Sequence, residues 1–126
     1  MKTKRRVMIA IVVLAMFLIA GQVFAATYNF NIYPLGYNTT SNEPKTGNCN
    51  WGYVGVANFS PSDRVVTVKF EDSSNNQIGT HQFAGPGSTL VFPDSSPCGV
   101  GQFRHFAFDN EYLVGSISIS GTWYPG

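Results

Sequence analysis

The chain has 126 residues, and its formal net charge of +1 reflects eight lysines and arginines against seven acidic residues. Four of the eight basic residues lie within the first six positions, so the remainder carries four basic and seven acidic residues, a net charge of −3. The remaining basic residues are scattered, whereas a phosphate backbone requires them to be clustered, which excludes nucleic acid from the expected partners. Aromatic residues make up 14% of the chain and predict a packed core.

The first 25 residues have the composition of a secretory signal. Basic residues precede an apolar run over positions 7–21, and Val23 and Ala25 supply the small residues of a cleavage site. An uncleaved membrane anchor is the alternative, but this run of 15 residues is shorter than the span of about 20 that a bilayer requires. No cysteine marks the site for lipidation. We therefore predict one mature domain, residues 26–126, that is secreted or at the cell surface, periplasmic or extracellular, and free of the membrane after cleavage.

We expect the mature part to be all-β, because it shows no helical periodicity and turn residues interrupt it roughly every eight to twelve positions. Seven strands are predicted, over residues 28–32, 51–59, 64–71, 78–83, 88–92, 103–108 and 112–123. Positions 34–48 are rich in Gly, Asn, Thr, Ser and Pro and are expected to form one long loop. The third strand alternates most clearly and should direct Val66, Val68 and Phe70 to one side.

Two cysteines, Cys49 and Cys98, occur in the sequence. In an exported chain a disulfide is favoured over free thiols or a metal site, because the compartment is oxidising and two thiols alone bind zinc poorly. If consecutive strands run up and down, both cysteines lie in loops at the same end of the domain. The bridge would close a loop of about 50 residues and contribute roughly 4 kcal/mol. The expected fold is an antiparallel two-sheet sandwich of about seven strands with one disulfide.

Four segments of this predicted sandwich resemble a recurring small extracellular fold. They are an Asn-bearing strand end at residues 56–60, a Val-rich strand ending in Asp at 65–72, a Pro-Gly turn with a short apolar strand at 85–92, and a strand with a Val-Gly core at 112–119. The pattern is similar to immunoglobulin-like modules and, more weakly, to the sandwich of the sensory rhodopsin transducer family. This resemblance implies the fold alone. The signal segment and the cysteine pair depart from the transducer pattern, so no signalling role is carried over.

No catalytic or metal-binding pattern occurs in the sequence, and we expect neither an enzyme nor a bound cofactor. His81 and His105 lie in predicted strands, and no serine stands in a Gly-x-Ser-x-Gly turn. Asp72, Ser74 and Asn76 alternate oxygen ligands as calcium loops do, but the central glycine and the closing glutamate of such loops are missing. Most other carboxylates fall in predicted turns, where they bond nearby backbone.

The residues best suited to a ligand or partner contact are the aromatic side chains Trp51, Tyr53, Trp123 and Tyr124. Trp and Tyr offer large rigid rings with a polar edge, which stack on sugars and anchor protein interfaces. In the predicted second strand, alternation places Ala57 and Phe59 on the same face as Trp51 and valines on the other. Because both faces are apolar, we expect this strand to be buried on both sides or to present one face to a partner.

Three classes of function remain open. The first is a secreted non-catalytic module that acts through its surface, as a structural, adhesive or self-assembling subunit or as a partner-binding domain. Its partner is a protein, including a second copy of the chain, or an extracellular glycan. In the self-assembling version, residues 28–33 add as a strand to a neighbour's sheet edge. The second is a carbohydrate-binding module that uses exposed Trp and Tyr. The third is a small secreted enzyme or inhibitor.

Overall fold

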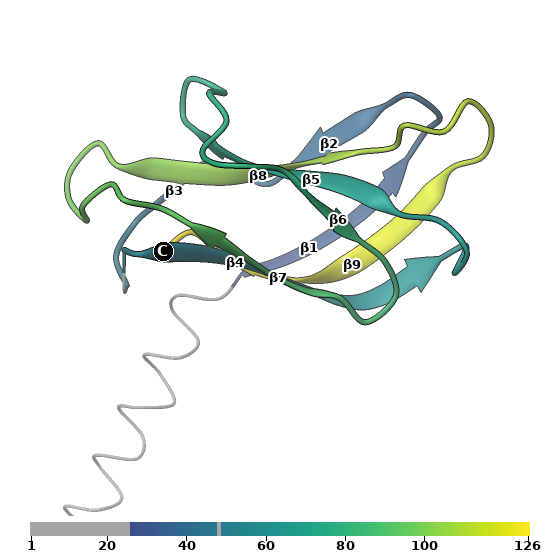
Figure 1. Cartoon of the computed structure of the whole chain (residues 1–126), viewed down its shortest axis with the longest axis horizontal. Coiled ribbons are helices and arrows are strands. Elements are labelled where there is room, and N and C mark those ends of the chain that lie inside the picture. The colour runs from purple at the N-terminus through teal and green to yellow at the C-terminus, as the bar shows by residue number, and fades with distance from the viewer. Residues whose placement is uncertain (1–25, 48) are drawn as a thin grey trace, which may run out of the picture.

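The computed structural model describes residues 26–47 and 49–126. The predicted signal segment, residues 1–25, lies outside the described residues, so its cleavage stays a prediction. The described residues fold into nine strands in two antiparallel sheets and form no helix, which confirms the predicted all-β sandwich (Figure 1). Across this part of the chain there is accordingly no helix of the length and apolarity needed to cross a membrane.

Sheet A, the lower sheet in Figure 1, has four strands, and sheet B, the upper sheet, has five. In spatial order, sheet A contains β1 (Ala26–Ile32), β9 (Ile117–Tyr124), β4 (Trp51–Ser60) and β7 (Thr89–Pro93). Sheet B contains β2 (Tyr37–Thr39), β8 (Phe103–Asp109), β5 (Val66–Asp72) and β6 (Gln82–Ala84), and β3 (Glu43–Pro44) also pairs with β8. β6 and β7 close one side of the sandwich, where Gln82 Nε2 donates to the Val91 carbonyl oxygen at 2.6 Å.

The structure has nine strands where the sequence predicts about seven, and the strand boundaries differ most in two loop regions and at the predicted fourth strand. The segment expected to be one long loop contains β2 and β3, which have three and two residues and are too short to show an alternating pattern. The last strand begins at Ile117 instead of Tyr112, because a side chain organises the turn before it. Asn110 Oδ1 accepts from Tyr112 N, and Asn110 Nδ2 donates to the Gly115 carbonyl oxygen, both at 3.0 Å.

The predicted fourth strand, residues 78–83, is divided by a glycine. Ile78 N donates to the Phe70 carbonyl oxygen at 2.7 Å, so the chain contacts β5 directly after the hairpin turn. Gly79 then has a φ of +69°, in the left-handed region that ends an extended run. Pairing with β5 resumes at Gln82, which leaves β6 only three residues long.

The core between the sheets is apolar and rich in aromatic rings. The inward side chains of β5, Val66, Val68 and Phe70, are all 0% exposed, as the alternation predicted. Trp123 of β9 is buried with them at 2% exposure, and its ring meets Phe106 edge-on with 6.1 Å between centroids. The two sheets are therefore held together by large side chains contributed from both layers.

A β-bulge in β4 between Val56 and Asn58 corrects one expectation from the sequence. The extra residue, Ala57, shifts the pairing with β9, so that Phe59 packs against the core instead of sharing the outer face with Trp51. Alternation cannot reveal such a bulge, because one inserted residue reverses the face of every later side chain.

The bulge is accommodated by a glycine in the neighbouring strand. A Cβ on Gly121 would lie 1.9 Å from the Gly55 carbonyl oxygen and 3.0 Å from Tyr28 Oη. The Tyr28 hydroxyl donates to that same carbonyl oxygen at 3.0 Å. Burial, and secondarily the nearby Tyr53, raises the pKa of Tyr28, which keeps the hydroxyl protonated as a donor.

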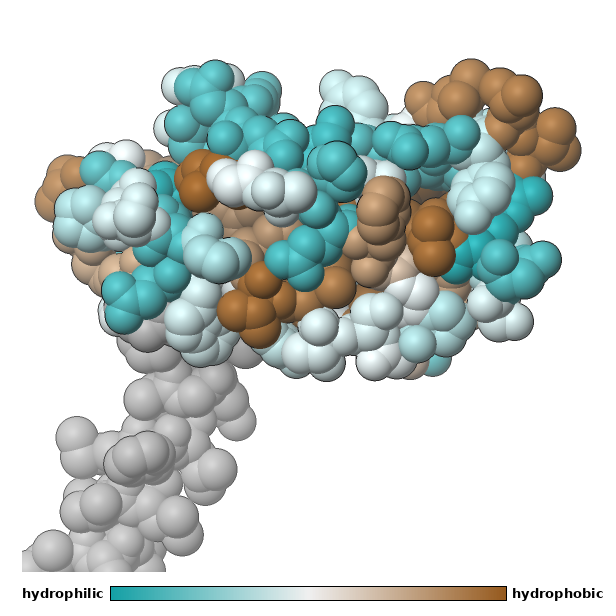
Figure 2. Space-filling view, in the orientation of Figure 1, coloured by the Kyte–Doolittle hydropathy of each residue, from teal (hydrophilic) through white to brown (hydrophobic). Residues whose placement is uncertain are grey.

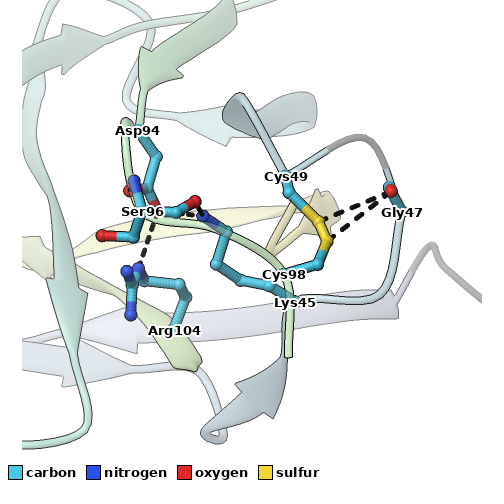
Figure 3. The surroundings of a disulfide bond; sticks show 7 residues. All are labelled: Lys45, Gly47, Cys49, Asp94, Ser96, Cys98 and Arg104. Atoms are coloured by element: carbon cyan, nitrogen blue, oxygen red, sulfur yellow. Dashed lines mark hydrogen bonds and ion pairs between the residues drawn. A yellow bond between two sulfur atoms is a disulfide. The ribbon is translucent and has the colours of Figure 1, made fainter. Parts of the chain in front are cut away.

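The predicted disulfide between Cys49 and Cys98 is confirmed. The Cα atoms of the pair are 5.2 Å apart, within the usual range for disulfides. Cys49 precedes β4 and Cys98 lies between β7 and β8, so the bridge joins two loops at one end of the sandwich. Both sulfur atoms face the Gly47 carbonyl oxygen, at 3.6 and 3.7 Å (Figure 3). A disulfide in an all-β domain fits an extracellular location.

Candidate functional site

The outer face of sheet A combines aromatic rings with short polar side chains, and none of its described side chains is charged. The outward side chains are Thr27, Asn29 and Asn31 from β1, Ser118, Ser120, Thr122 and Tyr124 from β9, Trp51, Tyr53, Asn58 and Ser60 from β4, and Thr89, Val91 and Pro93 from β7. Strand alternation produces this face, because the intervening residues supply the core. Along β9 the face extends about 20 Å from Tyr124 to Ser118, at about 3.3 Å a residue.

Three of the four aromatic residues predicted to bind lie together at the disulfide end of this face. Trp51 is 38% exposed and meets the Tyr124 ring edge-on, with centroids 6.0 Å apart and ring planes at 71°. Tyr53 lies directly opposite Tyr124 in the pairing of β4 with β9. A Cβ on Gly55 would lie 2.6 Å from Tyr53 Oη, so the Tyr53 ring leans along the strand over a residue without a side chain.

Rows of Asn, Ser and Thr continue the outer face of sheet A beyond the rings. Asn58 Nδ2 donates to Ser120 Oγ at 3.2 Å, and Ser118 Oγ donates to Asn31 Oδ1 at 3.4 Å. These bonds between neighbouring strands orient the amides and hydroxyls, which retain capacity for further hydrogen bonds. Sequence reasoning missed these residues, although the uncharged polar alternation over residues 27–31 and 118–122 was a usable signal.

The fourth predicted residue, Trp123, is not on this face. It is 2% exposed and lies opposite Val54 in the pairing of β9 with β4, on the core side. Consecutive residues of a strand point to opposite sides, so Trp123 and Tyr124 cannot share a face. The candidate site therefore comprises Trp51, Tyr53 and Tyr124 with the polar rows beside them.

A buried ion cluster fixes the chain that leads into Trp51. Asp94 N donates to the Asn50 carbonyl oxygen at 2.8 Å, which ties the end of β7 to the start of β4. Asp94 Oδ2 lies 2.7 Å from Arg104 Nε and 3.1 Å from Lys45 Nζ (Figure 3). All three charged side chains are at most 4% exposed. One carboxylate thus joins three separate segments beside the disulfide.

The same carboxylate is held in its ionised form. Burial alone would raise the pKa of Asp94, but hydrogen bonds from Arg104, from Ser96 N and from Lys45 outweigh burial and lower the pKa to about 2. Lys45 Nζ also donates to the Ser96 carbonyl oxygen. Since each charge has a partner within the chain, we assign this cluster a structural role in positioning the aromatic end of the outer face.

The outer face of sheet B is charged, unlike that of sheet A. Lys69 Nζ is 2.9 Å from Asp109 Oδ2, and this hydrogen bond raises the pKa of Lys69. His105 is only 3% exposed, with Nε2 2.9 Å from Glu71 Oε1 and Nδ1 2.6 Å from Asn42 Oδ1. A groove of about 350 Å³ above these pairs is lined by Tyr37, Thr39, Lys69, Glu71, Asn75, Ala107 and Asp109. The charged side chains of this groove are already paired, Lys69 with Asp109 and Glu71 with His105, so fewer of them are available to bind a ligand.

A third surface feature is an apolar tip at the end opposite the disulfide, at the upper right of Figure 2. Leu35, Leu113 and Val114 are 65%, 79% and 75% exposed there. Their two loops are neighbours, because Leu35 N donates to the Tyr112 carbonyl oxygen at 3.2 Å. Arg64, the cation beside the tip, is already engaged there, since it donates to the Val114 carbonyl oxygen and lies over the Tyr112 ring.

Of these three surfaces, the outer face of sheet A is the candidate functional site. Aromatic rings beside oriented amides and hydroxyls bind neutral, hydroxyl-rich molecules by stacking and hydrogen bonding. Its described side chains include no carboxylate, imidazole or amine for proton transfer. Comparison with known proteins adds no assignment, since no family model and no curated protein matches the chain.

Proposed function

We propose that this chain is a secreted, non-catalytic β-sandwich module that acts by binding, and that the outer face of sheet A binds neutral carbohydrate. The observation that carries the proposal is the group of Trp51, Tyr53 and Tyr124 on a face without charge among its described residues. This face is an open surface rather than a pocket, and it is therefore better suited to a polymer than to an enclosed small molecule.

The chemistry of the face favours a neutral sugar over other ligands. A sugar ring has an apolar face that stacks on Trp or Tyr and hydroxyls that bond to amides and hydroxyls such as Asn58 and Ser120. A sulfated or phosphorylated polymer would require Lys or Arg, which the described face lacks. A protein interface of ordinary composition would have charged residues at its rim.

Export and an immunoglobulin-like relationship are parts of this proposal. The disulfide between Cys49 and Cys98 supports export, because disulfides persist in oxidising compartments. The two-sheet antiparallel architecture supports the immunoglobulin-like relationship at the level of the fold. The alternative of a small enzyme or inhibitor has no specific observation in its favour.

We expect Trp51→Ala to weaken binding to a neutral polysaccharide by about tenfold or more, because it removes the exposed indole ring that packs against Tyr124. Affinity electrophoresis of the exported protein in gels containing soluble starch, xylan, mixed-linkage β-glucan or hydroxyethyl cellulose would identify the bound polymer. Titration calorimetry with oligosaccharides of that polymer would give the affinity. Binding should depend little on ionic strength, since the face is uncharged.

Phe83→Ala is the matched control, because Phe83 is a 56% exposed aromatic residue on β6 of the other sheet. It should leave the affinity unchanged. Tryptophan fluorescence gives a second readout: the bound sugar should alter the emission of Trp51 but not of the buried Trp123. If no neutral polysaccharide retards the protein, or if Trp51→Ala binds as well as the original chain, the proposal is wrong.

A further inference from the structure

β1 presents the longest open strand edge in the described structure. It lies at the end of sheet A and pairs with β9 along all seven of its residues. The strand contains no charged residue and no proline, and its pairing with β9 has no bulge. Natural sheet edges normally carry one of these features, because an unprotected edge readily pairs with another strand.

The remaining edges are shorter or protected. β7 has five residues, ends at Pro93, and has its Val91 carbonyl oxygen occupied by the Gln82 side chain. β2 and β6 have three residues each, and β3 contains Pro44. Among the described sheet edges, β1 is therefore the one that combines full strand length with the lack of a charge, a proline or a bulge.

The outer edge of β1 is capped at its C-terminal end alone. Asn38 Nδ2 donates there to the Asn31 carbonyl oxygen at 3.4 Å. No other described strand pairs with this edge. Because β1 is fully paired with β9, it is a fixed part of its own sheet and offers an edge to a neighbour instead of leaving as a donated strand.

We propose that two copies of the chain pair β1 against β1, antiparallel, about a two-fold axis at Asn29. The two four-stranded A sheets then join into one sheet of eight strands. In this register Asn29 faces Asn29 of the second copy, Tyr28 faces Phe30, and Thr27 faces Asn31. The inference goes beyond carbohydrate binding and does not depend on it.

The sequence of β1 is compatible with itself in this register. Around a two-fold axis a charged side chain at the centre would oppose its own copy, and β1 has none. On the core side, Phe30 is only half-buried at the open edge, so the strand of a second copy would cover the exposed part of its ring.

The joined sheet has a geometric consequence for the outer face. Paired residues in a sheet point to the same side, so the outer faces of both copies are directed the same way. A polymer that bound one aromatic group would meet a second one on the same surface. Its apparent affinity for the dimer would then exceed that for a single copy.

Cysteine cross-linking tests the register directly. Opposed residues in antiparallel strands have Cα atoms about 4.5 to 5.5 Å apart, a distance that a disulfide spans. The exported protein with Asn29→Cys should therefore form a covalent dimer under mild oxidation, with Cys49–Cys98 intact by peptide mapping. Thr89→Cys, on β7 at the opposite edge, is the control and should stay monomeric. Equal cross-linking of both variants, or none of Asn29→Cys, would overturn the proposal.

Sedimentation velocity tests the association without a covalent bond. The exported protein should be dimeric at submillimolar concentration, and Asn29→Lys should raise the dimer Kd several-fold, more at low salt, because like charges meet at the axis. Thr89→Lys should not change the Kd. An equimolar mixture of Asn29→Lys and Asn29→Asp chains should restore the dimer.

A protein that stays monomeric, or an Asn29→Lys variant that dimerises like the original, overturns the pairing. The outcome is independent of carbohydrate binding, which the Trp51 variant reports. A monomer that binds polysaccharide contradicts the dimer alone, and a dimer that binds none contradicts the proposed function alone.

Discussion

Asp94 illustrates how a single side chain can hold several segments of a small domain together. Its carboxylate receives Lys45 and Arg104, and its backbone N–H bonds to Asn50, the residue before Trp51. Two cations share one buried anion, so the anion is the member whose loss matters most. A residue with no contact to a ligand therefore determines where the aromatic end of the outer face lies.

We expect Asp94→Asn to lower the free energy of unfolding at pH 7 by about 3 kcal/mol or more, because two buried cations lose their counterion. The pKa of Asp94 falls from its ordinary value of 3.8 to about 2 in the fold. Its ionised form therefore stabilises the fold by roughly 2 kcal/mol above pH 4, and this contribution disappears as the pH falls from about 4 towards 2. The variant should show a weaker pH dependence over that range. Urea unfolding followed by circular dichroism at several pH values measures both effects.

Asp63→Asn is the control, since Asp63 is an exposed carboxylate in a turn. It should leave the stability at pH 7 unchanged. Asp72 also has a lowered pKa, owing first to its hydrogen bond from Asn76 N, so the comparison between variants isolates Asp94. Equal urea midpoints for Asp94→Asn and the original chain would show that the cluster contributes nothing.

Among the strands, sequence alternation was reliable where one face of a strand is buried. It identified Val66, Val68 and Phe70 as the inward residues of β5. Alternation gave the wrong prediction where a strand was too short to show a pattern, carried a bulge, or was replaced by a turn. Two short strands depend on pairing with β8, the bulge at Ala57 reverses the face of Phe59, and the Asn110 side chain forms a turn in place of strand. The short strands and the bulge depend on partners distant in the sequence, whereas the Asn110 turn is local and arises because a side chain bonds the backbone in place of a strand partner.

The fit between β4 and β9 at the bulge leads to a prediction about Gly121. Gly121→Ala should lower the free energy of unfolding by about 2 kcal/mol or more, because the new Cβ would overlap the Gly55 carbonyl oxygen, a backbone atom that cannot rotate away. Thr122→Ala, at the next and exposed position of β9, should cost less than about 1 kcal/mol. Urea denaturation of both variants measures the difference. Equal stability of the Gly121→Ala and Thr122→Ala variants would contradict this prediction, because it would mean that β4 and β9 can move apart to accept the new Cβ at little cost in free energy.

For the whole molecule, the disulfide is the longest covalent constraint among the described residues, with Cys49 and Cys98 separated by 49 positions. The double variant Cys49→Ala/Cys98→Ala should lose roughly 4 kcal/mol of stability, because a loop of this length gains much conformational freedom in the unfolded chain. Urea unfolding with and without a reductant provides the comparison. The reductant should lower the midpoint of the original chain to that of the variant and leave the variant unchanged. A variant as stable as the oxidised chain would contradict this account.

The candidate site is a property of the sheet order, which explains why it was only partly predictable. Trp51 and Tyr124 become neighbours because β4 and β9 pair, and nothing local to either strand indicates that pairing. Alternation shows that one of Trp123 and Tyr124 faces the core, but the register of the final strand decides which one. The polar rows on β1 and β9 likewise form a continuous surface only after the strands are placed side by side.

The unequal environments of the two described lysines determine how the protein can be attached to a support. The Lys45 side chain is 0% exposed in the ion cluster, whereas that of Lys69 is 35% exposed on sheet B. Of these two amines, an amine-reactive linker will therefore modify Lys69. Protein coupled to a sensor through this residue keeps Trp51 and the rest of the opposite layer turned towards the solution, where a dissolved polymer can reach it.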